Sequence, residues 1–348
     1  MDPWAAKATA WNPPGAWTRV VTVDAHTGGE PLRVVVAGFP TLEGASILTR
    51  RAFARARHDA LRTALMWEPR GHADMYGCVV VPPVSAHADF GVLFTHNEGY
   101  STMCGHGIIA VATVAVELGV VPPRGAETVV GIDTPAGFVR ATVLRDGGRV
   151  RSVSFVNVPS FVAALDREVA VPGLGTVGYD LAFGGAFYAF VDAQALGVRL
   201  VPEEVGHIIE VGRAVKAAVA GAPEIAHPED ADLGFLYGTI LVAPPHDPAN
   251  HSRNVCVFAD GEVDRSPTGT GVSARLALHH ARGEIGLGQE IRVESILGTC
   301  FGGSVVGTTD VGSRPAVIPR VTGSAHLTGR HEFWIDPDDP LAAGFIFR

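Results

Sequence analysis

The stretches CGHGIIAVATVAVELG (104–119) and TGTGVSARLALHHARG (268–283) repeat one pattern and decide how the chain is organised. When Cys104 is aligned with Thr268, three glycines and one alanine coincide. Each stretch predicts a Gly-x-Gly loop that opens an amphipathic helix, and each helix stops at a glycine, as helix C-termini often do. The copies begin 164 residues apart (104 to 268), close to half of the 348 residues, and a similar strand pattern follows each. The sequence therefore predicts two structurally related halves, each built around one helix.

Strand-like runs and turns fill the remainder of the chain and suggest how it divides. Residues 1–17 read as a leader ahead of the folded part. We expect a first half over residues 18–150, which carries the first helix pattern, and a second half over residues 151–324, which carries the second. The C-terminal segment 325–348 is expected to join the first half.

Three further segments give local expectations. Residues 51–64 (RAFARARHDALRTA) place Ala, Leu and Arg at helical spacing and predict one helix. Residues 203–221 (EEVGHIIEVGRAVKAAVAG) predict another. The glycines and prolines between Pro159 and Gly185 predict a turn-rich stretch.

Composition argues against several classes of function. The net charge of −9 disfavours nucleic acid as a partner, because phosphate binding needs a basic face. Lys7 and Lys216 are the only lysines, and neither lies in a context suited to a pyridoxal Schiff base. The apolar run that starts at Gly107 is broken by Glu117 and is too short to span a bilayer. Residues 1–17 lack the apolar region of a secretory signal, so a cytoplasmic location is the default expectation.

The four cysteines do not form a recognisable scaffold. A chain this long with four cysteines is not a disulfide-rich fold, and no pair has the C-x-x-C spacing of a zinc site. We therefore expect no metal site built from these cysteines.

The start of the first repeated helix combines two chemical features. The first amides of a helix have no intrahelical partner and carry partial positive charge, so Gly105 and Gly107 leave an open cradle for a carboxylate or phosphate. A thiol at this position, Cys104, is expected to have a lowered pKa because the same amides stabilise the thiolate. Two other interpretations of this segment stay open. Cys104 could be a buried structural cysteine without a chemical role. GHGIIA also weakly matches the dinucleotide fingerprint, so the segment could bind a dinucleotide.

Five blocks together resemble the proline racemase superfamily over nearly the whole chain from about residue 18. They are DAHTGGEPLRVV (24–35), EPRGHADMYG (68–77), HNEGYSTMCGHG (96–107), GGAFYAFVD (184–192) and DRSPTGTGVSAR (264–275). The resemblance implies a fold like that of diaminopimelate epimerase, in the α/β (α+β) class. It has two pseudo-symmetric halves, each with a curled, mainly antiparallel sheet around a central helix. It also implies chemistry without a cofactor, on a small imino acid, with a second copy of the chain as a candidate partner.

One position departs from the racemases of this family and suggests a different reaction. Racemases and 4-hydroxyproline epimerases carry a second catalytic cysteine where this chain has Thr268. The pair Cys104 and Thr268 resembles the branch that dehydrates trans-3-hydroxy-L-proline to Δ1-pyrroline-2-carboxylate, with the Cys104 thiolate taking the α-proton. A proline racemase or hydroxyproline 2-epimerase remains the alternative, and a non-catalytic relative of the fold is a third possibility.

The resemblance also implies roles for the neighbouring residues. Main-chain amides at Gly105 and His106, together with those at Gly269 and Thr270, are expected to hold the substrate carboxylate. Asp264 is expected to accept from the ring ammonium. Tyr237 is a weaker candidate for a contact with the ring or its hydroxyl, and no residue is assigned to a metal.

Overall fold

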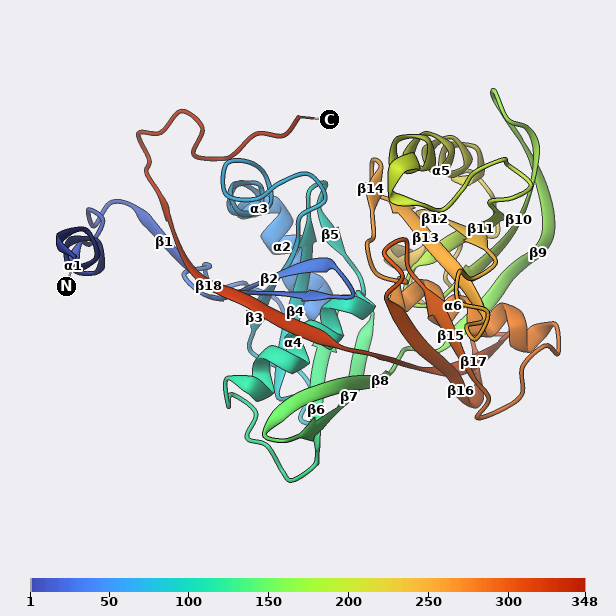
Figure 1. Ribbon diagram of the computed structural model, residues 1–348, viewed down its shortest axis with the longest axis horizontal. Helices are drawn as coiled ribbons and strands as arrows, with labels where there is room; N and C mark the ends of the chain where they lie inside the picture. Colours follow the sequence, from blue (N-terminus) through green and yellow to red (C-terminus); the bar gives the residue numbers. More distant parts are fainter. Residues whose placement is uncertain (1, 348) are drawn as a thin grey trace.

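The chain folds into two lobes that lie side by side (Figure 1), and the computed structural model describes residues 2–347. The first lobe is preceded by α1 (Pro3–Ala10) and contains β1 (Thr18–Thr27), β2 (Glu30–Ala37), α2 (Ile47–Arg57), α3 (Asp59–Met66), β3 (Tyr76–Val81), β4 (Phe90–His96), β5 (Tyr100–Ser101), α4 (Gly105–Glu117), β6 (Glu127–Thr134), β7 (Gly137–Asp146) and β8 (Arg149–Val156). The rest of the chain forms β9 (Ser160–Val171), β10 (Gly175–Phe183), β11 (Phe187–Asp192), the 3-10 turn η1 (Pro202–Glu204), α5 (Val205–Val219), η2 (Ala231–Leu233), β12 (Leu236–Ala243), β13 (Ser252–Phe258), β14 (Glu262–Val263), α6 (Gly269–Ala281), β15 (Glu290–Glu294), β16 (Cys300–Val311), β17 (Arg314–Gly323) and β18 (Ala325–Ile335).

The two lobes repeat the same pattern of strand pairing. In the first, β2 pairs parallel with β3, β3 antiparallel with β4, and β4 parallel with β6. In the second, β11 pairs parallel with β12, β12 antiparallel with β13, and β13 parallel with β15. Most of the other pairs are antiparallel. The predicted fold of two pseudo-symmetric halves, each with a curled and mainly antiparallel sheet, is confirmed.

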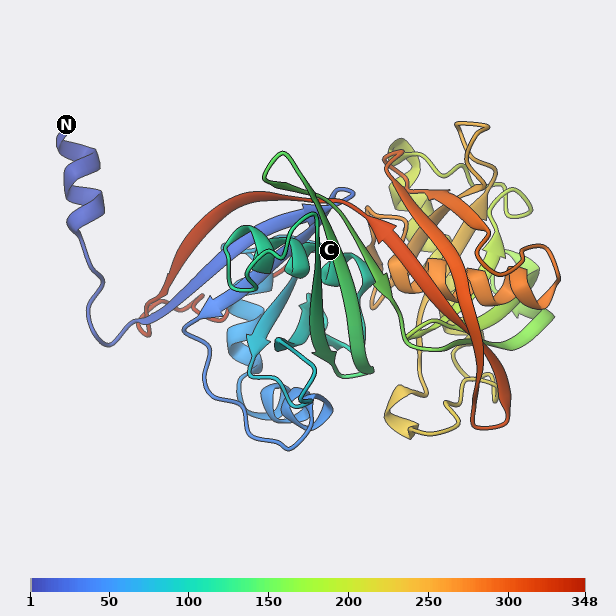
Figure 2. The same cartoon turned by 90° about the horizontal axis from the view of Figure 1, so that it is seen from below.

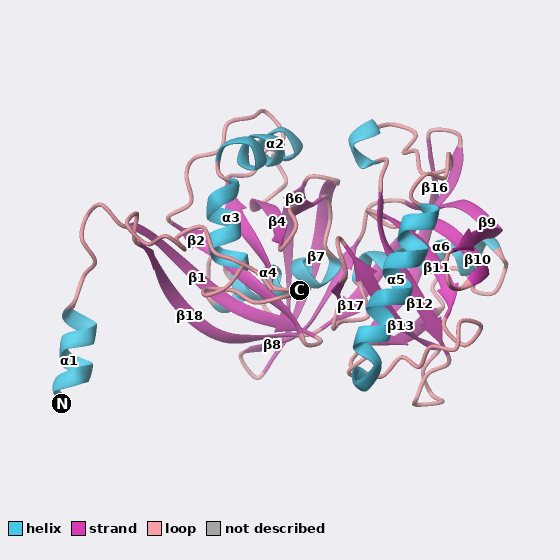
Figure 3. Cartoon of the chain, turned by 90° about the horizontal axis from the view of Figure 1, so that it is seen from above, coloured by secondary structure: helices cyan, strands magenta, loops and turns pink. Residues whose placement is uncertain are grey.

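Each lobe wraps its strands around one buried helix (Figure 3). In α4, every residue from Gly105 to Val116 is buried, and in α6 every residue from Gly269 to Leu278 is buried. α4 is apolar on almost every side, and such a helix is stable only when it is enclosed, which is why the sheet curls around it. The amphipathic character predicted for the two helices is wrong, because α6 is enclosed as well and buries Ser273 and Arg275. Both helices are followed by glycines in the left-handed region, Gly119 with φ 71° and Gly283 with φ 72°, as predicted.

The last strand returns to the first lobe. β18 pairs with β1 along its length and runs across the outer side of that lobe (Figure 2). β8 pairs with β7 in its own lobe and with β17 in the other, so the sheet is continuous between the lobes. The boundary expected after residue 150 falls inside β8, and the one expected after residue 324 falls just before β18. The division into 18–150 with 325–348, and 151–324, stays a prediction.

Three local expectations from the sequence need correction. The single helix expected over residues 51–64 is two helices, because His58 leaves the helical conformation with φ −133° between α2 and α3. The turn-rich stretch expected from Pro159 to Gly185 is wrong: β9 and β10 occupy most of it and pair with each other. The leader contains α1, whose residues are all exposed and which projects from the first lobe (Figure 2).

Within residues 2–347, no helix combines the length and apolar character needed to cross a membrane. The same described residues contain no group of three or more His, Cys, Asp or Glu side chains placed to hold a metal ion. All four cysteines are free.

Candidate active site

The N-termini of α4 and α6 touch each other where the two lobes meet. A Cβ atom added to Gly105 would lie 2.5 Å from the Gly269 Cα, and one added to Gly269 would lie 2.7 Å from the Gly105 Cα. Real Cβ contacts are longer, so only glycine allows the two backbones to approach this closely. The open amides of both helices therefore point into one small region that is suited to an anion.

We expect Gly105→Ala to separate the two helix ends and to weaken catalysis. Overpacking of this kind costs about 1–3 kcal/mol, so the free energy of unfolding should fall by about that amount. Gly206→Ala is the matched control, because Gly206 lies in the first turn of α5 and an added Cβ would meet no atom within 4 Å. Thermal unfolding and kcat/KM of both variants make the comparison. Equal stability and activity in the two variants would contradict the close approach.

One cavity between the helix ends collects all eight residues that the sequence singled out. It is lined by Tyr76, Met103, Cys104, Gly105, His106, Tyr188, Tyr237, Cys256, Phe258, Asp264, Thr268, Gly269 and Thr270. Its volume is ≈ 20 Å³, which is room for about one water molecule. The structure thus shows the site closed, and the lobes must move apart for a ligand to enter.

Cys104 caps the first of these helices. Its Sγ accepts a hydrogen bond from the Gly107 amide at 3.2 Å and lies 3.2 Å from the His106 Nδ1. The Cys104 side chain is buried, and the His106 ring is also buried, which lowers the pKa of the imidazole. A neutral imidazole beside the sulfur can accept a hydrogen bond from the thiol or donate one to the thiolate.

The expectation of a lowered Cys104 pKa is wrong for this closed, empty site. Burial raises the pKa of the thiol well above its usual value, and the negative charge of Asp264 acts in the same direction. Hydrogen bonds from the Gly107 amide and from Tyr76 lower the pKa but do not offset burial. The sequence revealed the helix terminus but not the enclosure that the second lobe creates.

Thr268 occupies the equivalent cap of α6 in a strained conformation. Its φ of 65° is unusual for a β-branched residue, and such strain tends to persist where function requires it. The side chain is buried, and within the described residues its Oγ1 makes no aligned hydrogen bond. Thr268 does lie close enough to Cys256 to lower the pKa of that thiol, although burial raises it more. Thr268 therefore places a hydroxyl in the cavity wall, beside the Cys256 thiol.

Two carboxyl groups lie close together in the segment that leads into α6 and at the start of β2. Asp264 is buried, and its Oδ1 accepts a hydrogen bond from the Ser266 amide at 2.7 Å. Glu30 lies behind it and accepts from the Arg265 amide at 2.7 Å. Burial and the charge of Asp264 raise the pKa of Glu30 well above its usual value, which favours its neutral form. Asp264 is thus the carboxylate that faces a ligand.

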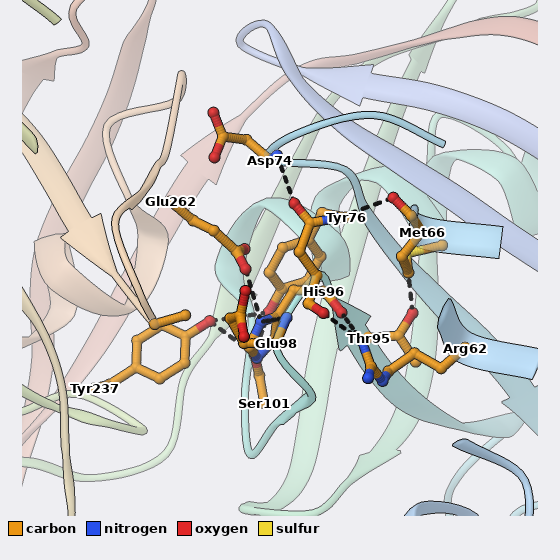
Figure 4. A network of polar contacts seen from close by, with 12 residues as sticks. Arg62, Met66, Asp74, Tyr76, Thr95, His96, Glu98, Ser101, Tyr237 and Glu262 are labelled. Carbon is orange, nitrogen blue, oxygen red and sulfur yellow. Dashed lines mark hydrogen bonds and ion pairs between the residues drawn. The ribbon is translucent and has the colours of Figure 1, made fainter. Parts of the chain in front are cut away.

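Hydroxyl groups from both lobes meet at the Cys104 side of the cavity (Figure 4). The Ser101 Oγ lies 2.8 Å from the Tyr237 hydroxyl and also hydrogen-bonds the Tyr76 hydroxyl. The two tyrosine hydroxyls are 3.4 Å apart. The His96 ring stacks on Tyr76 and its Nδ1 lies 3.3 Å from Glu262 Oε1. Tyr237 therefore belongs to a network and is not an isolated contact.

Sequence reasoning missed five of the residues that line the cavity, namely Tyr76, Met103, Tyr188, Cys256 and Phe258. Three of them, Tyr76, Met103 and Tyr188, lie inside the sequence blocks that carry the family resemblance. Those blocks were used only to identify the family, and these three residues were given no role. Cys256 and Phe258 come from β13, and no local pattern in that strand marks a site. Only the meeting of strands from different parts of the chain makes these residues neighbours.

A larger pocket of ≈ 400 Å³ borders the closed cavity and shares Tyr237 with it. Arg51 and Arg55 from α2 and Lys216 from α5 line this pocket, so it lies between the two lobes. It meets the closed cavity at Tyr237.

Comparison with known proteins extends over almost the whole chain. The proline racemase family matches residues 22–346. The chain belongs to the proline racemase family. Among its relatives there, it is 47% identical to the trans-3-hydroxy-L-proline dehydratase of Colwellia psychrerythraea, over 99% of this chain and 98% of that protein. It is also 50% identical to the 3-hydroxyproline 2-epimerase of Burkholderia multivorans, over 94% of this chain and 98% of that protein.

A solved structure of a hydroxyproline epimerase has the same architecture. The crystal structure of a hydroxyproline epimerase from Agrobacterium vitis, with bound trans-4-hydroxy-L-proline, superposes with a TM-score of 0.90 at 32% identity. The match covers 95% of this chain and 96% of that one. The family predicted from the five sequence blocks is thereby confirmed.

Proposed function

We propose that this protein dehydrates trans-3-hydroxy-L-proline to Δ1-pyrroline-2-carboxylate without a cofactor. The observation that carries the proposal is the unequal pair at the two helix ends, a thiol at Cys104 and a hydroxyl at Thr268. The full-length similarity to the Colwellia dehydratase supports the same substrate class.

The substrate carboxylate binds between the two helix N-termini in this proposal. The amides of Gly105 and His106 approach it from one lobe, and those of Gly269 and Thr270 approach it from the other. Because their backbones touch in the closed structure, one small anion can reach both sets at once. Asp264 accepts from the ring ammonium, which keeps the nitrogen protonated and makes the α-proton more acidic.

The Cys104 thiolate takes the α-proton. Burial raises the pKa of this thiol in the empty site, so the thiolate needs a positive charge nearby. The ring ammonium of the bound substrate supplies that charge, and its ion pair with Asp264 removes one of the negative charges that raise the pKa. Binding of the substrate therefore prepares its own base.

The stereochemistry of the substrate explains why one thiol is sufficient. In trans-3-hydroxy-L-proline the hydroxyl lies opposite the carboxylate, and so does the α-hydrogen. Both groups that are lost thus lie on the same face of the ring, and the elimination is syn. Inversion at Cα needs an acid on the opposite face. A threonine hydroxyl is a poor acid, so Thr268 disfavours inversion.

Asp264→Asn is expected to lower kcat/KM because the ring ammonium would lose its charged partner in a closed site. The loss corresponds to about 2–4 kcal/mol. Asp260→Asn is the control, since Asp260 lies in the same segment with an exposed side chain that pairs with Arg213. Steady-state kinetics of both variants test this role. A fall of less than about threefold in Asp264→Asn would show that Asp264 serves only the local turn.

A 2-epimerase of hydroxyproline is the second candidate, because the Burkholderia relative has that name and is 50% identical. One experiment separates the two. The protein, treated with EDTA and given no cofactor, is incubated with trans-3-hydroxy-L-proline, and the mixture is assayed for the cyclic imine and for inverted hydroxyproline. Formation of the imine supports the dehydratase, whereas inverted substrate without loss of water supports the epimerase.

A further inference from the structure

The Tyr76 hydroxyl lies on the Cys104 side of the cavity and has no role in the proposal above. Tyr76 begins β3, is buried, and packs its ring edge-on against His106 with 4.7 Å between ring centroids. A hydrogen bond from Tyr76 acts to lower the pKa of the Cys104 thiol, so the two groups are neighbours. The phenol has a pKa raised well above its usual value by burial, and it stays protonated at neutral pH.

The charge on Cys104 sets the direction in which Tyr76 donates. A thiolate only accepts hydrogen bonds, so beside the Cys104 thiolate the Tyr76 hydroxyl donates toward the sulfur. The Tyr76 oxygen is then free to accept, and Ser101, which hydrogen-bonds both Tyr76 and Tyr237, is placed to donate to it (Figure 4). Ser101 thereby supports the orientation of the Tyr76 proton toward the cavity.

The two faces of the substrate's pyrrolidine ring determine which protein groups can assist departure of its C3 hydroxyl. If Cys104 takes the α-proton, the C3 hydroxyl, which is on the same face, also lies on the Cys104 side. The opposite side holds Thr268 and Tyr188, and the Tyr188 hydroxyl is occupied by Thr270 Oγ1 at 2.7 Å. Of the hydroxyls on the Cys104 side, Tyr76 is the one whose hydrogen bond acts on the Cys104 sulfur, whereas Tyr237 also lines the cavity and pairs with Ser101.

We propose that Tyr76 protonates the departing C3 hydroxyl, an inference that rests on the dehydratase function. The Cα–H bond breaks and its proton passes to the Cys104 sulfur. Its electron pair forms the Cα=C3 double bond as the C3–O bond breaks. The oxygen takes the Tyr76 proton and leaves as water. The Tyr76 oxygen then takes the proton from the Cys104 thiol, because a phenolate is the stronger base. Thiolate and phenol are both restored, and no external acid is needed.

The test exploits the difference between hydroxide and fluoride as leaving groups. Hydroxide must be protonated to leave, whereas fluoride is a weak base that leaves without a proton. Tyr76→Phe should therefore lower the rate of water loss from trans-3-hydroxy-L-proline by about 10²–10³-fold, the usual contribution of a general acid. Fluoride release from trans-3-fluoro-L-proline should stay within about tenfold of wild type.

Tyr100→Phe is the matched control. Tyr100 is buried and precedes Ser101 in β5, but its hydroxyl lies toward Asp59 and Arg62, away from the cavity. This variant should process both substrates at near wild-type rates. Ser101→Ala should show a smaller fall of the same kind as Tyr76→Phe, with water loss affected more than fluoride loss.

Other outcomes overturn the proposal. If Tyr76→Phe loses water as fast as wild type, the Cys104 thiol itself protonates the hydroxyl. If water loss and fluoride loss fall equally in a Tyr76→Phe protein that folds normally, Tyr76 serves only to support the Cys104 thiol. Wild-type protein that forms no imine from trans-3-hydroxy-L-proline would instead refute the dehydratase function, so the two failures are distinct.

Discussion

Cys104→Ser is expected to abolish turnover of trans-3-hydroxy-L-proline while the protein stays folded. A serine hydroxyl does not ionise near neutral pH, so the base is lost and the rate should fall by at least about 10⁴-fold. The fold should be retained because serine is nearly the same size and is a favoured helix cap, able to accept from the Gly107 amide as the sulfur does. Imine formation and thermal unfolding measure the two effects. Near-normal activity in a folded Cys104→Ser protein would remove Cys104 from the role of base.

Alkylation provides a second test of Cys104 as the catalytic base. Iodoacetamide should inactivate the wild type, and pyrrole-2-carboxylate, a planar analogue of the substrate, should protect it. The site is closed and burial raises the pKa of the Cys104 thiol, so inactivation of the free protein should be slow and should accelerate as the pH rises. Cys300→Ser is the control, because Cys300 is the one cysteine of the described chain that is not buried. This variant should be inactivated at the same rate as wild type.

The sequence was sufficient to predict the two repeated helices because that signal is local. A Gly-x-Gly loop followed by a helical pattern is visible without knowledge of its partner. The roles assigned to the residues around these helices stay predictions. The strands β9 and β10 were missed for a local reason too. Val177, Tyr179, Leu181 and Phe183 alternate as a strand requires, but the glycines on either side outweighed that signal.

The features that depend on contact between the lobes could not be predicted. The pKa of the Cys104 thiol depends on how tightly the second lobe covers it, which no residue near Cys104 encodes. The contact of Tyr76 with Tyr237 joins residues from β3 and β12. These two strands hold equivalent places in the repeated topology, and the repeat alone does not say that their hydroxyls meet.

Thr268→Cys is expected to give the protein an activity that wild type lacks. A thiol at the start of α6 would face Cys104 across the cavity and provide the second acid that inversion at Cα requires. The rate of racemisation of L-proline, or of 2-epimerisation of hydroxyproline, should be about 10²–10⁴-fold higher than in wild type, where it should not be detectable. This is the range of rate enhancement that one acid–base group contributes. Dehydration should persist at a reduced level, because Cys104 still acts alone on its own face.

The geometry around residue 268 supports this gain. An added Cβ on Gly271 would lie 3.1 Å from the Thr268 Cγ2, and one on Gly107 would lie 3.0 Å from the Cys104 Sγ. Each cap thus brings a γ atom close to the third helical residue, although the backbones differ, with φ −147° at Cys104 and φ 65° at Thr268. A cysteine at position 268 whose sulfur takes the place of the Thr268 Cγ2 would lie beside Gly271 in the cavity wall. The new thiol will also share the burial that raises the pKa of Cys104, so the gained activity should increase with pH.

Cys256 makes a control necessary, since its thiol lies beside Thr268 and could act as the second acid. Each protein is incubated with L-proline in deuterium oxide under reducing conditions, and the products are separated by chiral chromatography. Wild type and Cys256→Ala should form no D-proline, whereas Thr268→Cys and the double variant with Cys256→Ala should both form it. If the double variant no longer forms D-proline, Cys256 is the acid on the ring face opposite Cys104. If wild type already interconverts the enantiomers, Thr268 does not block inversion, and the argument that distinguishes a dehydratase from an epimerase at this position is lost.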